Sequence, residues 1–369
     1  MPQVHFQIET APPRVLVHAG GEMRELPALW LREHCQDATH VDPDTQQRLF
    51  DPHRLPEDIV LTDARTYDED HVNLTFSDGY SGRYRLSALT TDFDSHDGCP
   101  EPAPWQADID RQSVTFAWPS LSESQALRAA AGAFLRYGFI ILRAVPTAPQ
   151  AILDVARAFG PPRETNFGRY FEVYSRPRSN DLAYRSVPLG PHTDNPYREA
   201  VPGIQLLHCL INETAGGLST LVDSLSVCAQ LAAEDPLGFA TLCDTPVRFR
   251  FVDDSNELIS RRPMICRTAD GQVTGVHYSP RLDELPLLPV DELKRFQRAR
   301  RRLGELFVDP RFQIRFPLRS GELMFFDNNR VLHGRTAFDP NEGRRHIQGC
   351  YIDADGPRSL FRTLNTAAG

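Results

Sequence analysis

The residues that offer chemistry most plainly are His192, Thr193 and Asp194, where one residue separates a histidine from a carboxylate. In a strand, side chains at positions i and i+2 point to the same side, so His192 and Asp194 can converge on one ion. One such spacing in a chain with 12 histidines is weak evidence, because it also arises by chance.

A second segment, residues 321–335, places His333 after an apolar strand and a turn. Two histidines and one carboxylate on one face of an octahedron form the facial triad of non-heme Fe(II) oxygenases. That arrangement leaves three positions open, as a bidentate co-substrate and O2 require. The sequence therefore predicts a metal site made of His192, Asp194 and His333.

Arg344 and Arg345 follow this histidine on the next expected strand. A guanidinium matches a carboxylate bidentately, so an arginine here suits the far carboxylate of a metal-chelated 2-oxo diacid. In the alternative interpretation, His333 is a turn histidine and Arg345 pairs with an acidic residue such as Asp353. The order and spacing of these residues together favour the metal site.

Composition bounds the protein that holds this site. The 369 residues are 41% hydrophobic and 24% charged, which favours two ordinary packed domains. The net charge of −9 without basic runs argues against nucleic acid as a partner. No apolar run reaches about 18 residues, and residues 1–10 lack an apolar signal core, so we expect a cytoplasmic protein without membrane contact. The 7 scattered cysteines form no CxxC pair and predict free thiols.

The pattern along the chain predicts three parts. Short alternating strands indicate a small β-rich N-terminal domain over residues 1–98, and a proline-rich stretch indicates a linker over residues 99–120. Residues 121–369 read as many short strands with flanking helices, which favours a mainly β jelly roll. We expect Ser122 to cap its first helix. The expected helices cover residues 123–137, 148–159, 225–233 and 290–306.

These residues resemble the γ-butyrobetaine dioxygenase and trimethyllysine dioxygenase family, within the wider taurine-dioxygenase-like superfamily. The resemblance extends over nearly the whole chain, including the N-terminal domain. Its matching stretches are residues 30–35, 47–51, 192–196, 203–209 and 345–351.

The resemblance implies a double-stranded β-helix from about residue 120 onward. It implies Fe(II) held by the predicted triad, 2-oxoglutarate bound by Arg345, O2 as co-substrate, ascorbate as reductant and a homodimer. Arg345 is preferred to Arg344 because it directly precedes His346 in the matching stretch. Ser219 is a weaker candidate for the same co-substrate, the alternative being a turn hydroxyl that satisfies local backbone.

The family binds a trimethylammonium group in an aromatic cage, whose positions fall here on Phe167, Phe171, Tyr184 and Tyr351. Such a cation has no N–H to donate, so ring faces and a nearby carboxylate must hold it, and Asp181 can supply that charge. The alternative is that these aromatic residues belong to the hydrophobic core.

The N-terminal domain departs from the family pattern, because relatives often build a zinc site there from cysteines and a histidine. Here Cys35 remains, while Asp37, His40 and Tyr80 stand at or near the other positions. Structural zinc takes four nitrogen or sulfur ligands, so we expect no structural zinc. Whether Cys35 and His40 hold any metal is left open.

A second departure lies at residues 278–281, where Ser279 and Arg281 replace asparagines that meet the substrate's anionic end. An arginine suits a carboxylate or a phosphonate, whereas the alternative pairs Arg281 with Asp283 or Glu284. The leading activity is hydroxylation of a small trimethylammonium zwitterion, γ-butyrobetaine to carnitine. The other candidates are 2-(trimethylammonio)ethylphosphonate, trimethyllysine, and a non-catalytic binding protein for quaternary ammonium compounds.

Overall fold

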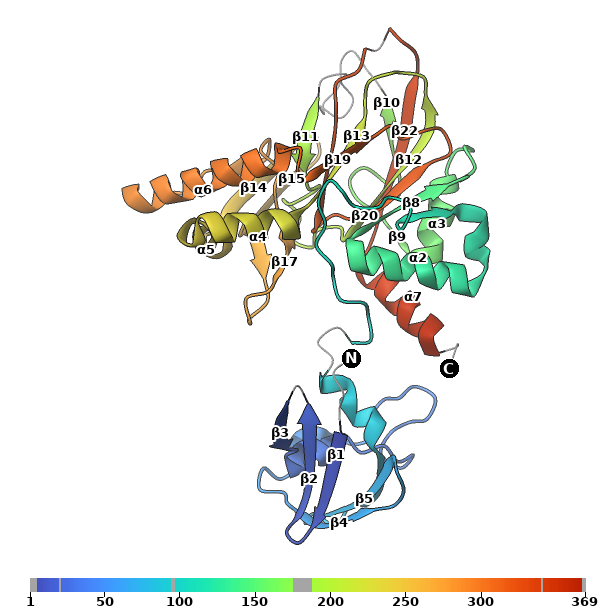
Figure 1. Cartoon of the computed structure of the whole chain (residues 1–369), viewed down its shortest axis with the longest axis vertical. Coiled ribbons are helices and arrows are strands. Elements are labelled where there is room, and N and C mark those ends of the chain that lie inside the picture. The colour runs from blue at the N-terminus through green and yellow to red at the C-terminus, as the bar shows by residue number, and fades with distance from the viewer. Residues whose placement is uncertain (1–4, 20, 94–96, 175–187, 340, 367–369) are drawn as a thin grey trace. The chain divides into compact units, whose positions relative to one another are not determined.

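The computed structural model describes residues 5–19, 21–93, 97–174, 188–339 and 341–366. The chain divides into two compact units, Met1–Gly98 and Cys99–Gly369, which Figure 1 draws in blue and in green to red. No helix within these ranges is both long enough and apolar enough to cross a membrane.

The described residues of the first unit form two three-stranded antiparallel sheets and one short α-helix. In β5, alternate residues are buried, which is the pattern of a strand with one face on a core. Asp78 and Gly79 lie in the turn between β5 and β6, and Gly79 adopts a positive φ of 86° that suits glycine. The elements are β1 (His5–Thr10), β2 (Pro13–Ala19), β3 (Glu22–Glu25), α1 (Ala28–Glu33), η1 (Pro52–Arg54), β4 (Leu61–Thr66), β5 (His71–Phe76), β6 (Ser81–Arg85) and η2 (Leu86–Phe93).

Cys35, Asp37, His40 and Tyr80, the positions that the sequence analysis considered for zinc, lie together in this unit. Tyr80 donates a hydrogen bond to Asp37, and His40 Nδ1 lies 3.2 Å from the Asp37 carboxylate. The Arg32 guanidinium lies 4.0 Å from the centre of the Tyr80 ring, and its Nη1 is 3.7 Å from the Cys35 sulfur. A cation therefore lies beside the cysteine that remains.

The second unit is built on a seven-stranded sheet of order β10-β22-β12-β20-β8-β7, with β9 paired to β22. A four-stranded sheet of order β11-β21-β13-β19 accompanies it. The strands are β7 (Thr115–Ala117), β8 (Phe139–Arg143), β9 (Pro162–Arg163), β10 (Phe171–Tyr174), β11 (Leu189–His192), β12 (Ile204–Asn212), β13 (Ser219–Asp223), β19 (Gln313–Phe316), β20 (Leu323–Asp327), β21 (Val331–Arg335) and β22 (Arg345–Ile352).

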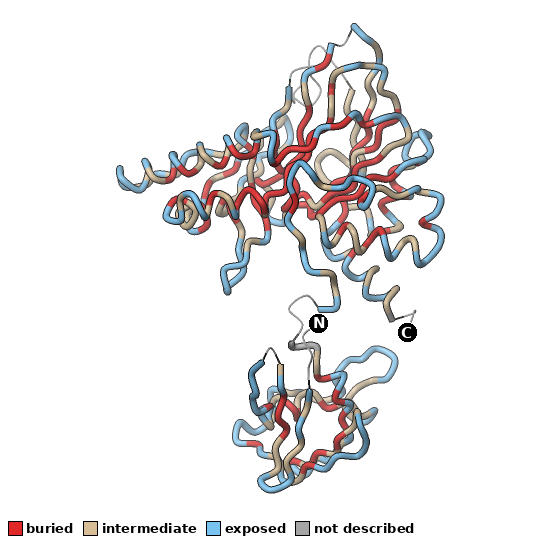
Figure 2. The backbone as a smooth tube through the Cα atoms, viewed as in Figure 1, coloured by how far each residue is buried: buried red, intermediate tan, exposed pale blue. Residues whose placement is uncertain are grey.

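The two sheets share one buried cluster, in which Phe139 and Phe326 of the larger sheet meet Leu221 and Ile314 of the smaller one. The other face of the larger sheet packs on α2 (Ser124–Tyr137) and α3 (Ala151–Phe159), with α7 (Asp355–Thr366) beside α2 (Figure 1). Figure 2 shows the buried residues concentrated along the strands. The prediction of a mainly β fold with flanking helices is confirmed.

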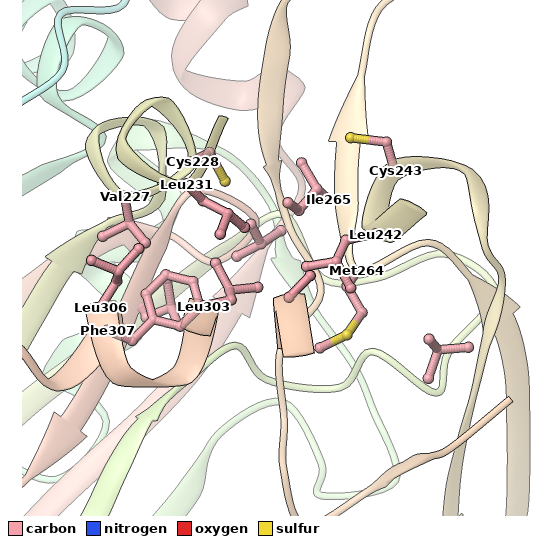
Figure 3. Close-up of a cluster of buried hydrophobic side chains, with 14 of the residues drawn as sticks. Val227, Cys228, Leu231, Leu242, Cys243, Met264, Ile265, Leu303, Leu306 and Phe307 are labelled. Carbon is pink, nitrogen blue, oxygen red and sulfur yellow. The ribbon is translucent and has the colours of Figure 1, made fainter. Parts of the chain in front are cut away.

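The outer face of the smaller sheet packs on a third layer through Val222 and Leu332. In this layer Leu231 lies close to Leu303 and Phe307, as Figure 3 shows. Its elements are α4 (Ser224–Glu234), α5 (Pro236–Asp244), β14 (Val247–Val252), β15 (Glu257–Arg262), β16 (Ile265–Arg267), β17 (Val273–Val276), β18 (Asp283–Glu284) and α6 (Val290–Val308). The third layer thus covers the outer face of the smaller sheet, which carries His333 on β21.

Residues 99–120, which composition suggests as a linker, are packed into the second unit. Trp105 and Val114 are buried, and β7 pairs in parallel with β8. The Trp105 backbone N–H donates to Asp223, and its indole donates to the Tyr137 carbonyl at 2.7 Å. Residues 99–114 form no helix or strand, yet Trp105 and Val114 within them are buried.

The expected N-cap of α2 is wrong. Helix α2 begins at Ser124, and the residue before it, Glu123, makes no side-chain capping bond. Ser122 instead belongs to the 3-10 helix η3 (Trp118–Ser122), where its hydroxyl donates to the Pro119 carbonyl at 3.0 Å. Gly138 ends α2 in the left-handed conformation.

Candidate active site

The three predicted metal ligands converge beside the smaller sheet, at the pairing of β11 with β21. His192, the last residue of β11, lies directly opposite His333 of β21, and the two ring centres are 4.3 Å apart. His192 Nε2 lies 3.2 Å from Asp194 Oδ1, and His333 Nε2 lies 4.0 Å from Asp194 Oδ2. The ligand atoms all lie within 4.8 Å of one another, which is close enough to bind one ion.

Asp194 lies beyond the end of β11, so strand geometry does not position it. The Asn328 side chain holds it instead, accepting from the Asp194 N–H at 2.7 Å and donating to the Asp194 carbonyl at 2.9 Å. Asn195 has a positive φ of 58° and turns the chain away. The fully buried side-chain amide of Asn328, in the turn that follows β20, thus fixes the backbone of Asp194.

One oxygen of the Asp194 carboxylate is committed to two protein donors. Its Oδ2 accepts from Gln205 Nε2 at 2.8 Å and from the Tyr351 hydroxyl at 2.7 Å. Gln205 of β12 and Tyr351 of β22 are directly opposite each other in the sheet. The second oxygen, Oδ1, faces His192, so the carboxylate presents one oxygen toward the triad centre.

The protonation states of Asp194 and His333 suit the binding of a cation. Burial raises the pKa of Asp194, but hydrogen bonds and charges from His192, His333 and Tyr351 outweigh burial and hold it well below its usual value. Burial and the His192 charge lower the pKa of His333 to about 3, so its ring is neutral and a nitrogen lone pair is available. His192 Nδ1 lies 3.0 Å from the Gly190 carbonyl, an N–H···O contact that directs Nε2 inward.

These donors fit Fe(II). Two neutral imidazole nitrogens and one carboxylate oxygen are the ligand set of non-heme iron oxygenases, and no second carboxylate or thiol lies in the group. Among the described residues, no other His, Cys, Asp and Glu side chains form such a group.

Arg345, the first residue of β22, lines the same pocket as the triad. Its Nε is buried without a hydrogen-bond partner within the described part of the chain. Gly217 leaves room for it, because a Cβ at that position would lie 3.1 Å from Arg345 Nε. Asp353 accepts from Arg163 at 2.8 Å, so the alternative partner expected for Arg345 is engaged elsewhere. Ser219, on β13, is buried and lines this pocket.

The expectation that Arg344 contributes to the pocket is wrong. Arg344 is exposed and donates to Glu213 at 2.9 Å, and it is not among the pocket residues. Successive residues of an extended chain point to opposite sides, so Arg344 and Arg345 cannot both face the site.

Aromatic side chains form one wall of the pocket. Phe171 lies between Phe167 and Tyr351, with ring centres 6.2 and 5.5 Å away. Phe251 of β14 lies 5.8 Å from Phe167 and stacks on Tyr197. Tyr184 and Asp181 lie outside the described residues.

Ser279 and Arg281 also line the pocket, and Ser279 is buried. The Arg281 charge lies close enough to His333 to contribute to its low pKa. Asp283 pairs with Arg300 at 2.7 Å, and Glu284 pairs with Arg248. Both carboxylates that the sequence offered to Arg281 therefore have other cationic partners.

Sequence reasoning missed several residues that shape the site. Asn328, Gln205 and Arg335 all lie in stretches already recognised as matching or as carrying a ligand. Arg335 stands two residues after His333, so the same-side rule for strands identifies it as a pocket residue. Nothing in the spacing points to Phe251, because β14 belongs to a separate hairpin that packs against the site.

Gln205→Ala is expected to weaken Fe(II) affinity about 10- to 100-fold, because the carboxylate ligand loses a donor that orients it. Metal affinity is measured by anaerobic calorimetry on the metal-free protein. Gln348→Ala is the matched control: Gln348 is a buried glutamine of β22 that bonds Glu172 on the opposite face of the sheet. Equal affinity in the Gln205 variant and the unaltered protein would contradict a positioning role.

Comparison with known proteins agrees with this geometry. Residues 100–351 match the family described as taurine catabolism dioxygenase TauD, TfdA family, and residues 15–90 match the γ-butyrobetaine hydroxylase-like N-terminal domain. A γ-butyrobetaine dioxygenase of Pseudomonas sp. (strain AK-1) is 32% identical over 344 residues, covering 91% of this chain and 90% of that protein. The mitochondrial trimethyllysine dioxygenase of Gallus gallus is 29% identical, covering 92% and 83%. The crystal structure of PvcB from Pseudomonas aeruginosa aligns with a TM-score of 0.50 at 20% identity, covering 69% and 91%.

The chain therefore belongs to the TauD/TfdA dioxygenase family. It is an Fe(II)- and 2-oxoglutarate-dependent dioxygenase, as the sequence predicted, with a γ-butyrobetaine hydroxylase-like N-terminal domain.

Proposed function

We propose that this dioxygenase hydroxylates a small trimethylammonium zwitterion, with γ-butyrobetaine as the leading substrate and carnitine as its product. The observation that carries the proposal is the aromatic wall of Phe167, Phe171 and Tyr351 in the same pocket as the triad. Ring faces attract a cation that has no N–H to donate. The similarity to γ-butyrobetaine dioxygenase and trimethyllysine dioxygenase supports the same substrate class.

In this proposal His192, Asp194 and His333 hold the iron, and Arg345 with Ser219 holds 2-oxoglutarate. When bound, iron and 2-oxoglutarate supply the oxidation, in which O2 gives one oxygen atom to succinate, with loss of CO2, and the other to a substrate C–H. Ascorbate keeps the metal reduced. The two packed sheets provide the jelly-roll framework, and we expect a homodimer.

The protein's own part is positioning and exclusion of water. The aromatic wall holds the trimethylammonium group, and Ser279 and Arg281 meet the anionic end. Asp181 and Tyr184 are proposed to complete the cage. Gln205 and the Tyr351 hydroxyl keep one oxygen of Asp194 occupied. Burial and the Asp194 charge raise the pKa of Tyr351 well above its usual value, so the phenol keeps its proton and remains a donor.

The test is succinate formation with Fe(II), ascorbate and 2-oxoglutarate across a panel of trimethylammonium compounds. We expect strong coupling to γ-butyrobetaine. Coupling to 5,5-dimethylhexanoate, which keeps the carboxylate but has an uncharged tert-butyl group in place of the trimethylammonium group, should be at least about tenfold weaker, because only the cation is attracted by ring faces. No coupling to any cationic member, or equal use of the isostere, would refute the cage.

A phosphonate is the second candidate for the anionic end. Arg281 lines the pocket, and a guanidinium suits a more highly charged group than the asparagines of relatives do. Coupling to 2-(trimethylammonio)ethylphosphonate alone, lost in Arg281→Asn, would assign the protein to that substrate. Preference for γ-butyrobetaine in both forms of the protein would exclude it.

Gly349→Ala is expected to raise the KM for the quaternary substrate about tenfold or more, because a Cβ there would lie 2.2 Å from the Phe171 ring and displace this face of the cage. Steady-state kinetics measure the KM, while calorimetry measures 2-oxoglutarate affinity, which should change little. An unchanged KM in Gly349→Ala would exclude Phe171 from substrate binding.

A further inference from the structure

Strand β10, which carries Phe171, lies at the edge of the larger sheet. It has 4 residues and, among the described residues, pairs with β22 alone. Phe171 and Val173 line the pocket, so the alternate residues Glu172 and Tyr174 lie on the opposite face of the sheet. A short edge strand opens easily, because backbone bonds on one side alone hold it. The position of the Phe171 ring therefore depends on what else holds β10 to β22.

The Glu172 carboxylate supplies such an anchor on the face away from the pocket. Its Oε1 accepts from Gln348 Nε2 at 2.9 Å, and its Oε2 accepts from His346 Nε2 at 2.5 Å. Both donors belong to β22, and Gln348 is directly opposite Glu172 in the ladder. Because each carboxylate oxygen has its own donor, the two bonds fix the orientation of the group.

The anchor continues through Gln348 to a helix. Gln348 is fully buried, and its Oε1 accepts from the backbone N–H of Gln150 at 3.1 Å. Gln150 directly precedes α3, which packs on the same face of the sheet. Gln348 thus uses both ends of its amide, so it cannot turn away from Glu172 without losing a second bond.

On the pocket side, the residue opposite Phe171 has no side chain. This register partner is Gly349, and the Phe171 ring lies over it, because a Cβ there would be 2.2 Å from the ring. No side chain at that position of β22 holds the ring in place. The location of the ring is therefore set by where the β10 backbone lies, and the anchor on the other face fixes that backbone.

We propose that Glu172 is a positioning residue for the substrate: its hydrogen bonds to His346 and Gln348 hold β10 on β22 and so keep the Phe171 ring in the aromatic wall. This rests on the proposed function, because it assigns the wall to a quaternary ammonium group. Glu172 does not itself line the pocket, so it acts on substrate affinity through Phe171. In the rival assignment, Glu172 is a peripheral glutamate whose loss leaves substrate binding unchanged.

The experiment measures steady-state kinetics with γ-butyrobetaine on the full chain. Glu172→Ala should raise the KM about fivefold or more and change kcat by less than about twofold, because substrate and transition state lose the same ring contact. The affinity for 2-oxoglutarate, measured by anaerobic calorimetry, should change by less than about twofold. Glu164→Ala is the matched control, because Glu164 is an exposed glutamate ahead of β10, and it should leave the KM unchanged.

Glu172→Gln separates hydrogen bonding from charge. An amide accepts from Gln348 and can donate to the other tautomer of His346, so both bonds survive. We expect a KM within about twofold of that of the unaltered protein. A KM as high as in Glu172→Ala would overturn the proposal, because the charge and not the two bonds would then matter. An unchanged KM in Glu172→Ala, with a raised KM in Phe171→Leu, would overturn it as well.

Amide hydrogen exchange tests the anchor without any substrate. In Glu172→Ala the amides of residues 171–174 should exchange about fivefold faster or more, while those of β20 keep their rates. Unchanged exchange in β10 would show that Glu172 does not hold the strand. If no trimethylammonium compound supports turnover of the unaltered protein, the proposed substrate is wrong, and the exchange rates still decide whether the anchor exists.

Far-ultraviolet circular dichroism shows whether each variant folds. If Glu172→Ala does not fold, His346→Ala removes one of the two donors and should raise the KM about threefold, with faster exchange in β10. An unchanged KM or unchanged exchange in a folded His346→Ala would then refute the proposal.

Discussion

His192→Ala is expected to abolish 2-oxoglutarate turnover, with a loss of at least about a thousandfold in succinate formation. The substitution removes one of the three proposed ligands, and the two that remain, Asp194 and His333, cannot define a face of an octahedron. Fe(II) affinity should fall in parallel, because binding of the metal depends on all three deprotonated ligands.

The measurement is succinate formation at saturating Fe(II), together with calorimetry of Fe(II) binding to the metal-free protein. His53→Ala is a suitable control, because the His53 side chain is 93% exposed in the first unit. Full activity in the His192 variant would show that the metal assignment is wrong.

Asp223→Ala is expected to destabilise the second unit by about 3–5 kcal/mol, because it leaves the buried Arg330 guanidinium without a counter-charge. Arg330 donates to Asp223 at 2.9 Å, and the two side chains are 4% and 0% exposed. Arg330 also donates to the carbonyls of Arg136 and Ala103. The pair therefore connects the segments that contain Ala103, Arg136, Asp223 and Arg330, and removal of the carboxylate disturbs all four.

Urea unfolding followed by near-ultraviolet circular dichroism measures this change in free energy. The double variant Asp223→Leu with Arg330→Met should be more stable than Asp223→Ala alone, because it buries no unpaired charge. A loss below about 0.5 kcal/mol in Asp223→Ala would show that water reaches the pair.

The sequence predicts correctly that His192, Asp194 and His333 come together, because ligand chemistry restricts the residue types strongly. Histidine and aspartate with one residue between them, followed by a distal histidine, suffice to place three side chains together. The strand argument is wrong about what positions Asp194, which lies beyond β11 and is held by Asn328 from the turn between β20 and β21. Local periodicity carries no information about such a distant amide.

Other errors have equally physical origins. Arg344 and Arg345 have the same chemistry in sequence, and only the pleat of the chain decides which one faces the pocket. Ser122 has a good capping side chain, but a preceding 3-10 helix takes its hydroxyl. Phe251 joins the aromatic wall through packing of a hairpin, which depends on the whole third layer and not on its neighbours in sequence.

The buried Asp223–Arg330 pair has a consequence for where the catalytic unit can be cut. Ala103 and Trp105 bond directly to this pair, and β7 covers the edge of β8. A truncated chain that starts at residue 121 would lose the bonds from Ala103 and Trp105 to this pair, and it would also lose β7. The edge of β8 would then have unpaired backbone groups that can associate with other chains. A catalytic fragment that keeps these contacts therefore has to start before Ala103. Residues 103–120 are needed for its structure, although their prolines suggest a linker that could be removed.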